Sequence, residues 1–355
     1  MNFGARNGII MEKEITSYRE IYLEAGQVIG EIYMVGGSVR DVFLGICPQD
    51  YDFCTPLLPD EIEEKVRLAG KRPYLIGKKF GTVGFKIKGK VCEVTTYRTE
   101  CYEKNSRKPK VDFVNDLYLD LERRDFTINA IALRFNGVDE EFIDPFGGRA
   151  DIEKGIIRAV GSAEERIKED PLRMLRAARF VSELDFDLDD PLTDAIKKRA
   201  RSIFTVSKER WTSELDKLLT GDNPEKGLQV LADTGLLRYI FPELWLQIGF
   251  DQDSPYHSLT LWEHTKKVVS MSQNNIETRW ASLLHDVGKP FVKNKNSKGY
   301  SSYTMHDKVG SEMACGIAYR LKWPKKREEI VTHLILTHMD DNSPLRETDN
   351  RAKQE

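Results

Sequence analysis

The sequence lacks long apolar runs, closely spaced cysteines and a large net charge, and each absence excludes a class of protein. No apolar stretch approaches the length of a membrane span, and charged residues stand where a signal peptide would be apolar. The five cysteines show no CxxC spacing, which argues against a zinc or dithiol motif and predicts free thiols in a reducing compartment. We therefore expect a cytoplasmic protein without a membrane partner.

The net charge of −3 provides no overall positive field that would attract nucleic acid. Contact with RNA would have to come from local basic patches, for which residues 197–201 together with Lys208 and Arg210, and residues 325–327, are candidates. Such clusters are more often solvated helix faces. Neither patch by itself predicts a nucleic-acid partner.

Histidine is absent from the first 250 residues. All six histidines follow, at His257, His264, His285, His306, His333 and His338. The length of 355 residues is enough for two or three domains. The uneven distribution predicts that the N-terminal chemistry proceeds without histidine and that the C-terminal third is a different module.

A glycine pair followed by two aspartates is the main chemical signal of the N-terminal part. The apolar run before Gly36 and Gly37 breaks there, and tandem glycines let bare backbone N–H groups approach a phosphate at a helix start. Asp50 and Asp52 would share one face of a strand. Each motif alone is usually a turn or a solvated strand end, but together they predict a phosphate site beside bound Mg²⁺.

Hydrophobic periodicity predicts alternating helices and strands up to residue 97. The expected elements are a helix over 14–30, a strand over 31–36, a helix over 39–44, a strand over 50–54, a helix over 59–69 and a hairpin with strands at 82–88 and 91–97. Glu93 lies in the second hairpin strand. It is a candidate third metal carboxylate and, with equal weight, an ordinary surface residue.

The pattern changes after residue 97. Residues 98–112 are polar without periodicity, which predicts a mobile loop, and the apolar positions of 121–133 suit a helix packed on a sheet. Proline and paired glycines in 144–151 predict a domain hinge. Beyond it strand signals nearly vanish, and helices are expected over 163–181, 190–202, 207–219, 224–234, 257–273, 276–286, 306–322 and 325–339.

Six segments occur in an order typical of one enzyme family. They are GGSVRD (36–41), DYD (50–52), RRDFTINAIAL (123–133), DPFGGRADIEKGIIRAVG (144–161), EDPLRMLRAARF (169–180) and SKERWTSEL (207–215). With these segments the chain resembles the tRNA nucleotidyltransferase and poly(A) polymerase family of the polymerase-β-like superfamily, in its bacterial and eukaryotic branch. Each motif alone is weak, but their common order makes the resemblance specific over roughly residues 30–240.

The resemblance implies an α+β protein. Its parts would be a polymerase-β-like nucleotidyltransferase head with a small mixed sheet at 14–148, an all-α neck and body at 149–250 that bind nucleotide and tRNA, and an HD domain at 251–345. The implied enzyme adds C, C and then A to the 3′ end of tRNA from CTP and ATP, and releases pyrophosphate. It would hold the acceptor stem and elbow of tRNA.

The resemblance also assigns roles to residues of the head. Asp50 and Asp52 are implied to hold two Mg²⁺ ions, one that activates the primer 3′-hydroxyl and one that steadies the triphosphate, with Glu93 as the candidate third carboxylate. The residues implied to bind the triphosphate are Gly36, Gly37, Ser38 and Arg40, and those implied to contact the ribose are Arg124, Asp125 and Asn129.

Asp170 and Arg173 are the candidates for base selection. Three residues apart, they are expected to share one helix face, where the bland alternative is a surface ion pair worth a few tenths of a kcal/mol. In the family context the carboxylate would accept from the exocyclic amine of cytosine or adenine, and the guanidinium would donate to the ring. Uracil and guanine would mispair with both at about 1–3 kcal/mol per buried group. Glu169 is expected to orient this helix.

The product is not determined by the sequence. Family members that add the final A have a flexible loop at the position of residues 98–112, and CC-adding members have a shortened loop there. In this sequence the segment is present, and its charged residues include Arg98, Glu103, Lys104 and Arg107. Complete CCA addition is therefore favoured over A-only or CC-only addition. The further alternatives are a poly(A) polymerase, for which the net charge of −3 is unfavourable, and a metal-dependent phosphohydrolase. Oligomeric state is not determined.

The C-terminal residues 257–341 resemble the HD phosphohydrolase superfamily. His264 lies in an amphipathic segment and His285-Asp286 ends another, which suits a divalent metal that activates water. The pattern also requires an aspartate on a later helix. Asp340 and Asp341 are the candidates, and neither has the expected distance from His285, so we expect a shortened HD module or one that ends before its last helix.

Overall fold

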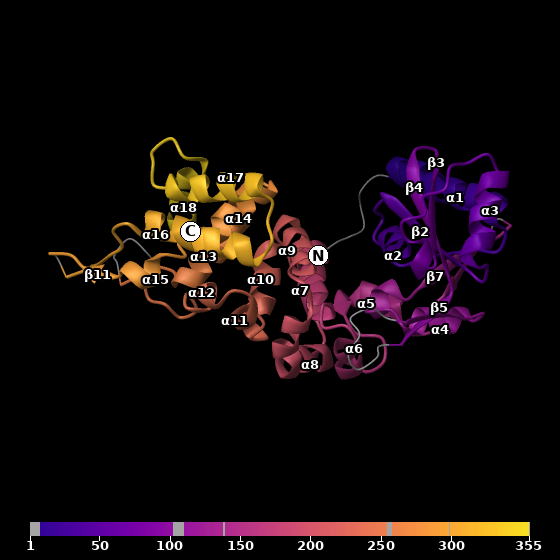
Figure 1. Cartoon of the computed structure of the whole chain (residues 1–355), viewed down its shortest axis with the longest axis horizontal. Coiled ribbons are helices and arrows are strands. Elements are labelled where there is room, and N and C mark those ends of the chain that lie inside the picture. The colour runs from indigo at the N-terminus through magenta and orange to yellow at the C-terminus, as the bar shows by residue number, and fades with distance from the viewer. Residues whose placement is uncertain (1–7, 102–109, 138, 254–257, 298, 355) are drawn as a thin grey trace. The chain divides into compact units, whose positions relative to one another are not determined.

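The computed structural model describes residues 8–101, 110–137, 139–253, 258–297 and 299–354, and its two compact units are Met1–Ala163 (unit 1) and Glu164–Glu355 (unit 2) (Figure 1). Unit 1 extends beyond residue 148, where the sequence places the end of the head. The reason is that Thr127 N donates to Arg158 O (2.9 Å) and Val160 N to Asp125 O (3.2 Å), which ties the following segment to the same core. The separate body and HD boundaries stay a prediction.

Unit 1 is built on a six-stranded mixed sheet with the order β3-β4-β2-β1-β7-β8. Strands β2 and β4 are parallel, and the other neighbours are antiparallel. The strands are β1 (Tyr33–Val35), β2 (Asp50–Thr55), β3 (Thr82–Ile87), β4 (Lys90–Thr96), β7 (Ala132–Asn136) and β8 (Asp139–Ile143). The predicted α+β head with a small mixed sheet is confirmed.

The helices of unit 1 pack on this sheet. They are α1 (Gly8–Ile29), α2 (Gly37–Phe43), α3 (Pro59–Leu68), α4 (Leu117–Glu122) and α5 (Gly148–Lys154), with short 3₁₀ turns η1 (Lys78–Phe80) and η2 (Thr127–Asn129). Helices α1 and α3 cover one face of β3, and α3 also contacts β4 (Figure 1). The helices predicted over 14–30, 39–44 and 59–69 are thus confirmed. Their ends agree to within a few residues, except that α1 begins earlier than predicted, at Gly8.

Alternation along residues 50–53 of β2 gives this part of the sheet one closed and one open face, whereas Cys54 farther along β2 is buried in a cluster with Leu121 of α4. Tyr51 and Phe53 are buried, and the Tyr22 ring of α1 packs 6.0 Å from that of Phe53. Asp50 and Asp52 point to the opposite face and are exposed. The hairpin predicted at 82–88 and 91–97 forms β3 and β4, beside β2.

The helix predicted over 121–133 is wrong. Helix α4 ends at Glu122, and the apolar residues that follow enter η2 and then the strand β7 between β1 and β8. Asp120 forms ion pairs with Arg123 (2.8 Å) and Arg124 (3.0 Å) at this end of α4. A central strand buries apolar side chains on both faces, so a continuous apolar run suited it as well as a helix.

The prediction of a mobile loop over 98–112 is wrong at both ends of this segment, where the structure has strands. Strand β5 (Arg98–Cys101) pairs antiparallel with β6 (Lys110–Phe113). Backbone pairing can order a polar segment that shows no hydrophobic period, which is why periodicity missed it. Glu103, Lys104 and Arg107 lie outside the described residues.

Unit 2 is helical, as predicted, and its described strands have only two residues each. The helices are α6 (Ala163–Glu169), α7 (Arg173–Leu184), α8 (Asp190–Arg199), η3 (Ala200–Thr205), α9 (Lys208–Thr220), α10 (Pro224–Asp233), α11 (Leu237–Ile240), α12 (Pro242–Trp245), α13 (Leu261–Met271), α14 (Ile276–Leu284), α15 (Lys289–Val292), α16 (His306–Arg320), α17 (Lys325–Leu336) and α18 (Pro344–Gln354). The short strands in the rest of the chain are β9 (Ile156–Ile157), β10 (Asp187–Leu188), β11 (Asn294–Lys295) and β12 (Ser301–Ser302).

Two expectations for unit 2 are corrected. The single helix predicted over 163–181 is interrupted after Glu169, because Pro171 has no N–H to donate and biases Asp170 away from helical geometry. Helix α18 was not predicted. Its buried residues Leu345 and Ala352 are seven apart in an otherwise polar segment, too sparse a pattern for a periodicity argument.

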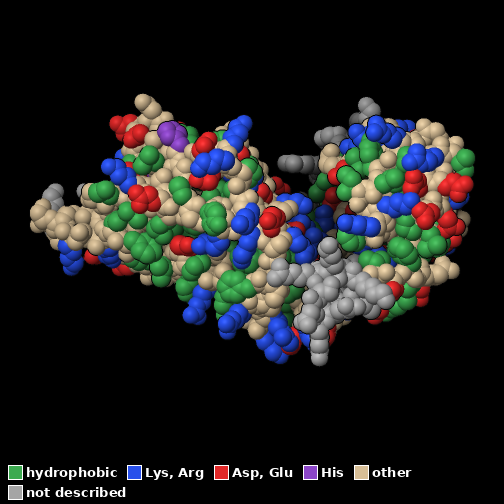
Figure 2. All heavy atoms as spheres, viewed as in Figure 1, with side chains coloured by type: hydrophobic (Ala, Val, Ile, Leu, Met, Phe, Trp, Pro, Cys, Tyr) green, Lys and Arg blue, Asp and Glu red, His purple; other side chains and the backbone are tan. Residues whose placement is uncertain are grey.

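Charges of both signs are mixed on the surface of the protein. On the face drawn in Figure 2, Lys and Arg side chains are interspersed with Asp and Glu, in agreement with the net charge of −3. No helix within the described ranges is long and apolar enough to cross a membrane. Of the cysteines, Cys47, Cys54, Cys92 and Cys315 are free thiols, as expected.

Substitution of Gly148 is expected to destabilise unit 1 through η2. A Cβ at Gly148 would lie 2.1 Å from Thr127 O and 2.9 Å from Ile131 Cγ1, so Gly148→Ala should lower the free energy of unfolding by about 1–3 kcal/mol. Gly26→Ala is the matched control. Its nearest neighbour would be Ile32 Cδ1 at 3.9 Å inside α1, where alanine should stabilise by about 0.5–1 kcal/mol. Thermal denaturation of both variants measures the difference, and equal stability would contradict the close packing of η2.

Candidate functional site

Three carboxylates share the open face of the sheet in unit 1. Asp52 on β2 is paired in register with Glu93 on the parallel strand β4, and Asp50 precedes Asp52 by two residues on the same face. Enclosure by protein atoms, reinforced by Glu93 and Asp50, raises the pKa of Asp52 to about 6, although Arg124 opposes the shift. Asp52 keeps an edge accessible to solvent. Clustered hard oxygen donors of this kind fit a divalent cation.

The glycine turn lies directly beside Asp52. Gly36 has φ +70°, which favours glycine, and a Cβ there would come within 3.6 Å of Asp52 Oδ2 and 3.2 Å of Arg124 Nη1. Ser38 Oγ accepts from Asp52 N (2.9 Å) and donates to Asp50 O (3.2 Å). Helix α2, which Gly37 begins, is thereby clamped to the strand that carries the two aspartates.

The residues implied to bind triphosphate and ribose are joined by hydrogen bonds. Arg40 Nη1 donates to Asn129 Oδ1 (2.9 Å), and Asn129 Nδ2 donates to Asp125 Oδ1 (3.1 Å). Asp125 and Asn129 are buried at η2. Arg124 pairs with Asp120 and reaches the Gly36 turn. The fold therefore brings together residues that are about 90 positions apart in the sequence.

Asp170 and Arg173 do not share a helix, contrary to expectation. Asp170 lies in the turn before α7, where its Oδ1 accepts from Leu172 N (3.1 Å). Its Oδ2 accepts from Arg210 Nη2 (2.7 Å). The sequence placed Arg210 only in a basic cluster, and no local signal pointed to this pairing across 40 residues.

Arg173 is buried and held separately. Its Nη1 donates to Glu169 Oε2 (2.7 Å) and to Arg166 O (2.8 Å). Glu169 also pairs with Arg166 (2.7 Å). The carboxylate of Asp170 and the guanidinium of Arg173 are thus each oriented by partners of their own.

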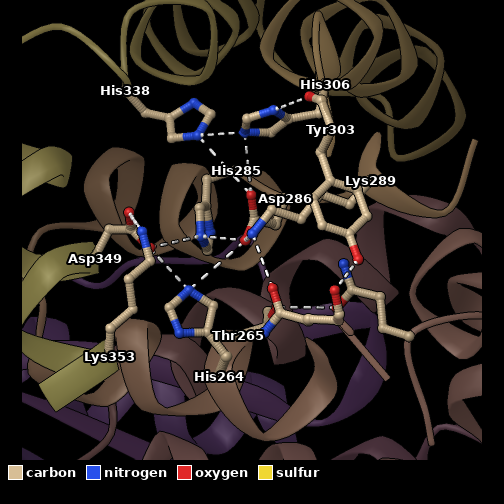
Figure 3. Close-up of polar contacts among 12 residues, drawn as sticks. His264, Thr265, His285, Asp286, Lys289, Tyr303, His306, His338, Asp349 and Lys353 are labelled. Atoms are coloured by element: carbon tan, nitrogen blue, oxygen red, sulfur yellow. Dashed lines mark hydrogen bonds and ion pairs between the residues drawn. The ribbon is translucent and has the colours of Figure 1, made fainter. Parts of the chain in front are cut away.

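In unit 2, four buried side chains from three helical regions point toward one another (Figure 3). They are His264 of α13, His285 and Asp286 after α14, and Asp349 of α18, and their ligand atoms all lie within 4.8 Å of one another. His264 Nε2 lies 2.8 Å from Asp349 Oδ1, and His285 Nε2 lies 3.1 Å from Asp286 Oδ2. We call these four residues the HD cluster.

Asp349 replaces Asp340 and Asp341 as the later aspartate of the HD pattern. Helix α18 supplies the later aspartate, whereas Asp340 and Asp341 are exposed and lie in the turn that precedes it. The available signal was Pro344 at a helix start, followed by Leu345, Asp349 and Ala352 at helical spacing.

A second group shares Asp286 with the HD cluster. His306 and His338 place their Nε2 atoms 3.4 and 3.9 Å from Asp286 Oδ1, and these two nitrogens lie 3.1 Å apart. Each ring donates from Nδ1 to a backbone carbonyl, of Tyr303 and Ile335 respectively. Both Nε2 atoms of neutral rings would then present lone pairs to each other, an arrangement that a cation between them would stabilise.

Electrostatics around Asp286 favour neutral imidazoles at His306, His338 and His264, whose pKa burial also lowers, and a charged imidazole at His285 alone. Burial lowers the pKa of His338 to about 4 and also lowers that of His306. Burial would lower the pKa of His285 as well, but the carboxylates of Asp286 and Asp349 outweigh it and raise the pKa to about 9. Lys289 Nζ lies 2.7 Å from Asp286 Oδ2.

The mixed nitrogen and oxygen donors of both groups fit a divalent metal ion. His285 resembles metal-ligating histidines in a further respect, since its Nδ1 donates to Ser282 O (2.7 Å) and fixes the ring. The sequence drew attention to His306 and His338 but gave them no role, because residues 32 apart show no spacing motif.

Three protein-family models match successive parts of the chain. They describe a poly A polymerase head domain at residues 32–158, a probable RNA and SrmB-binding site of polymerase A at 185–248 and an HD domain at 256–354. Together they follow the order that the sequence motifs indicated.

Relatives and solved structures point in the same direction. The chain is 46% identical over 211 residues to a CCA-adding enzyme of Geobacillus kaustophilus (59% of this chain, 50% of the relative) and 41% identical over 273 residues to that of Geobacillus thermodenitrificans (74% and 62%). The chain thus spans only half to about three fifths of the length of these curated relatives. A crystal structure of the Bacillus stearothermophilus CCA-adding enzyme in complex with CTP matches with a TM-score of 0.64 and 31% identity, over 96% of this chain and 82% of that chain.

Metal binding by the HD cluster should depend on Asp349 and not on Asp340. At about 100 times the dissociation constant, Mn²⁺ should raise the melting temperature of unit 2 by about 5 °C, because it binds only the folded state. Asp349→Ala removes one of four buried donors and should abolish most of this shift, whereas the exposed Asp340→Ala should keep it. Differential scanning calorimetry with Mn²⁺ and with chelator measures the shift, and an Mn²⁺ response retained by Asp349→Ala would contradict the assignment.

Proposed function

The chain belongs to the tRNA nucleotidyltransferase and poly(A) polymerase family, and we propose that it adds C, C and A to the 3′ end of tRNA from CTP and ATP. The observation that carries the proposal is the row of Asp50, Asp52 and Glu93 beside the Gly36 turn. The related structure that contains CTP supports CTP as a substrate. We place the reaction in the cytoplasm, where tRNA and nucleoside triphosphates occur together.

Asp50, Asp52 and Glu93 would hold Mg²⁺, whose preference for carboxylate oxygens fits this donor set. Bound Mg²⁺ supplies positive charge that acidifies the primer 3′-hydroxyl and offsets the negative charge of the departing pyrophosphate. The raised pKa of Asp52 supports this role, because burial and then the neighbouring carboxylates disfavour its ionised form, which a bound cation would favour.

The neighbouring residues would position the nucleotide. The backbone at Gly36 and Gly37 and the guanidinium of Arg40 receive the triphosphate, because bare N–H groups and positive charge both favour phosphate oxygens. Asn129 is held between Arg40 and Asp125, which fixes the orientation of its amide for the ribose hydroxyls. Ser38 acts indirectly, by joining α2 to β2.

Asp170 and Arg173 would read the base. Asp170 accepts from the exocyclic amine that cytosine and adenine share, and Arg173 donates to the adjacent ring acceptor. Their fixation by Arg210 and Glu169 supports this role, because a reader that is already oriented loses less entropy on binding.

A metal-dependent hydrolase activity of unit 2 is the second candidate, and the HD cluster favours it. His264, His285, Asp286 and Asp349 would hold a divalent ion that lowers the pKa of water. Lys289, beside Asp286, would attract an anionic substrate such as a phosphate ester. The two activities involve separate residues.

Extension of three tRNA transcripts tests the main proposal. The transcripts end before CCA, after C and after CC, and each is incubated with Mg²⁺ and CTP, ATP or both. We expect three, two and one additions and then arrest. Addition only to the CC-ending transcript would indicate an A-adding enzyme. Arrest after CC would indicate a CC-adding enzyme, and long adenylate tails on any RNA would indicate a poly(A) polymerase.

The same assay separates the two units. Asp52→Asn should reduce incorporation at least about 100-fold, because charge stabilisation by a bound metal contributes several kcal/mol to phosphoryl transfer. His285→Ala is the control and should leave incorporation unchanged. Loss of incorporation in His285→Ala with retention in Asp52→Asn would reverse the assignment.

Base selection should weaken when Asp170 is shortened. Asp170→Ala leaves the base amine without an acceptor, so discrimination of CTP over UTP should fall about tenfold, as one buried polar group is worth about 1–3 kcal/mol. The ratio of kcat/KM for the two nucleotides measures the change. Asp194→Ala, which removes an exposed carboxylate of α8, is the control. Unchanged discrimination in Asp170→Ala would contradict the base-reading role.

A further inference from the structure

Tyr74 lies at the end of the row of carboxylates in unit 1. Asp52 pairs with Glu93, Glu93 with Gly84, and Gly84 with Tyr74, across three successive strand contacts. Tyr74 N donates to Gly84 O (2.6 Å), and Gly84 N donates to Tyr74 O (3.0 Å). The position of Tyr74 is therefore fixed by the edge of the sheet.

Tyr74 shares the open face with the carboxylates, because directly paired residues on neighbouring strands project to the same side. A Cβ at Gly84 would lie 3.5 Å from Tyr74 Cβ and 3.6 Å from Cδ2, so the side chain lies over Gly84. Gly84 is buried, whereas Tyr74 itself stays 42% exposed. An aromatic side chain is thus presented to solvent next to Glu93.

The two sides of Asp52 differ. On the β1 side lies the Gly36 turn, and on the β4 side lie Glu93 and then Tyr74, since the sheet order places β1 and β3 on opposite sides of β2. In phosphoryl transfer the attacking oxygen and the leaving group are in line across the phosphorus. With the triphosphate at the Gly36 turn, the 3′-hydroxyl of the RNA approaches from the side of Glu93 and Tyr74.

We propose that Tyr74 stacks on the terminal base of the RNA whose 3′-hydroxyl is extended, an inference that rests on the proposed function. The terminal base changes with each addition, from the base that precedes CCA to the first and then the second C. A hydrogen-bonding reader would fit only some of these bases. An aromatic ring accepts all of them, because every base has a π face.

A base analogue reads this stacking without any chemical step. A tRNA acceptor hairpin that ends in 2-aminopurine, whose fluorescence is quenched on stacking, is titrated with the full chain. The wild type should quench the probe. Tyr74→Ala and Tyr74→Leu should leave the probe unquenched, and Tyr74→Trp should quench it. The leucine variant is informative because it keeps an apolar side chain over Gly84 but has no π face. Tyr118→Ala, which removes a tyrosine that is 47% exposed on α4, is the matched control.

Steady-state kinetics provide the second readout. Tyr74→Ala and Tyr74→Leu should raise the KM for tRNA about tenfold, since stacking on an aromatic residue contributes about 1–3 kcal/mol per base. The KM for CTP should not change, because the nucleotide binds on the other side of Asp52. Tyr74→Phe should behave like the wild type, since the ring and not the hydroxyl is required.

The outcomes separate this inference from the proposed function. Equal quenching by wild type and Tyr74→Leu, or an equal loss in Tyr74→Phe, would overturn stacking even if CCA is added. Tyr74-dependent quenching by a protein that incorporates no nucleotide would support stacking and contradict the proposed function. Quenching lost equally in Tyr118→Ala would also overturn the inference, since the effect would then not be specific to this edge of the sheet.

Discussion

The parallel pairing of β2 with β4 is the constraint on which the carboxylate site depends. It sets Asp52 directly beside Glu93, although these residues belong to different segments, and it leaves Tyr51 and Phe53 to fill the core behind them. The gain in free energy from burying the closed face holds three like charges together on the open face. Burial, reinforced by Glu93 and Asp50, raises the pKa of Asp52, and a divalent cation would favour its ionised form.

The HD cluster depends on closure by the last helix. Helix α18 is polar over most of its surface, yet Leu345 and Ala352 anchor it and thereby bury Asp349 against His264. Asp286, a member of this cluster, also faces the pair His306 and His338. A buried set of this kind is costly to desolvate unless the charges are compensated. Lys289 supplies part of this compensation, and the Nε2 atoms of His306 and His338, 3.1 Å apart, could hold a divalent cation that would supply more.

Ion pairs orient the residues to which we assign base reading. Asp170 pairs with Arg210 and Arg173 with Glu169, and these partners restrict rotation of both side chains. The pair of Asp170 with the exposed Arg210 adds little to stability. The effect of both pairs that matters here is geometric, because a selective hydrogen-bonding group must be held in place before the base arrives.

The sequence alone determined the family, the α+β head, the helical second unit and most of the chemically important side chains, because motifs such as the glycine pair and the two aspartates combine residue type with short spacing. It did not determine the structure of 121–133, where an apolar run fitted a helix and a buried strand equally well. It also missed Arg210, Asp349 and the position of Tyr74, whose contacts join residues distant in the sequence. Spacing along the chain reports which residues share a local face, whereas sheet register and helix packing decide which faces meet. Only the tertiary structure supplies that second kind of information, since it follows from burial of the whole core and not from any one segment.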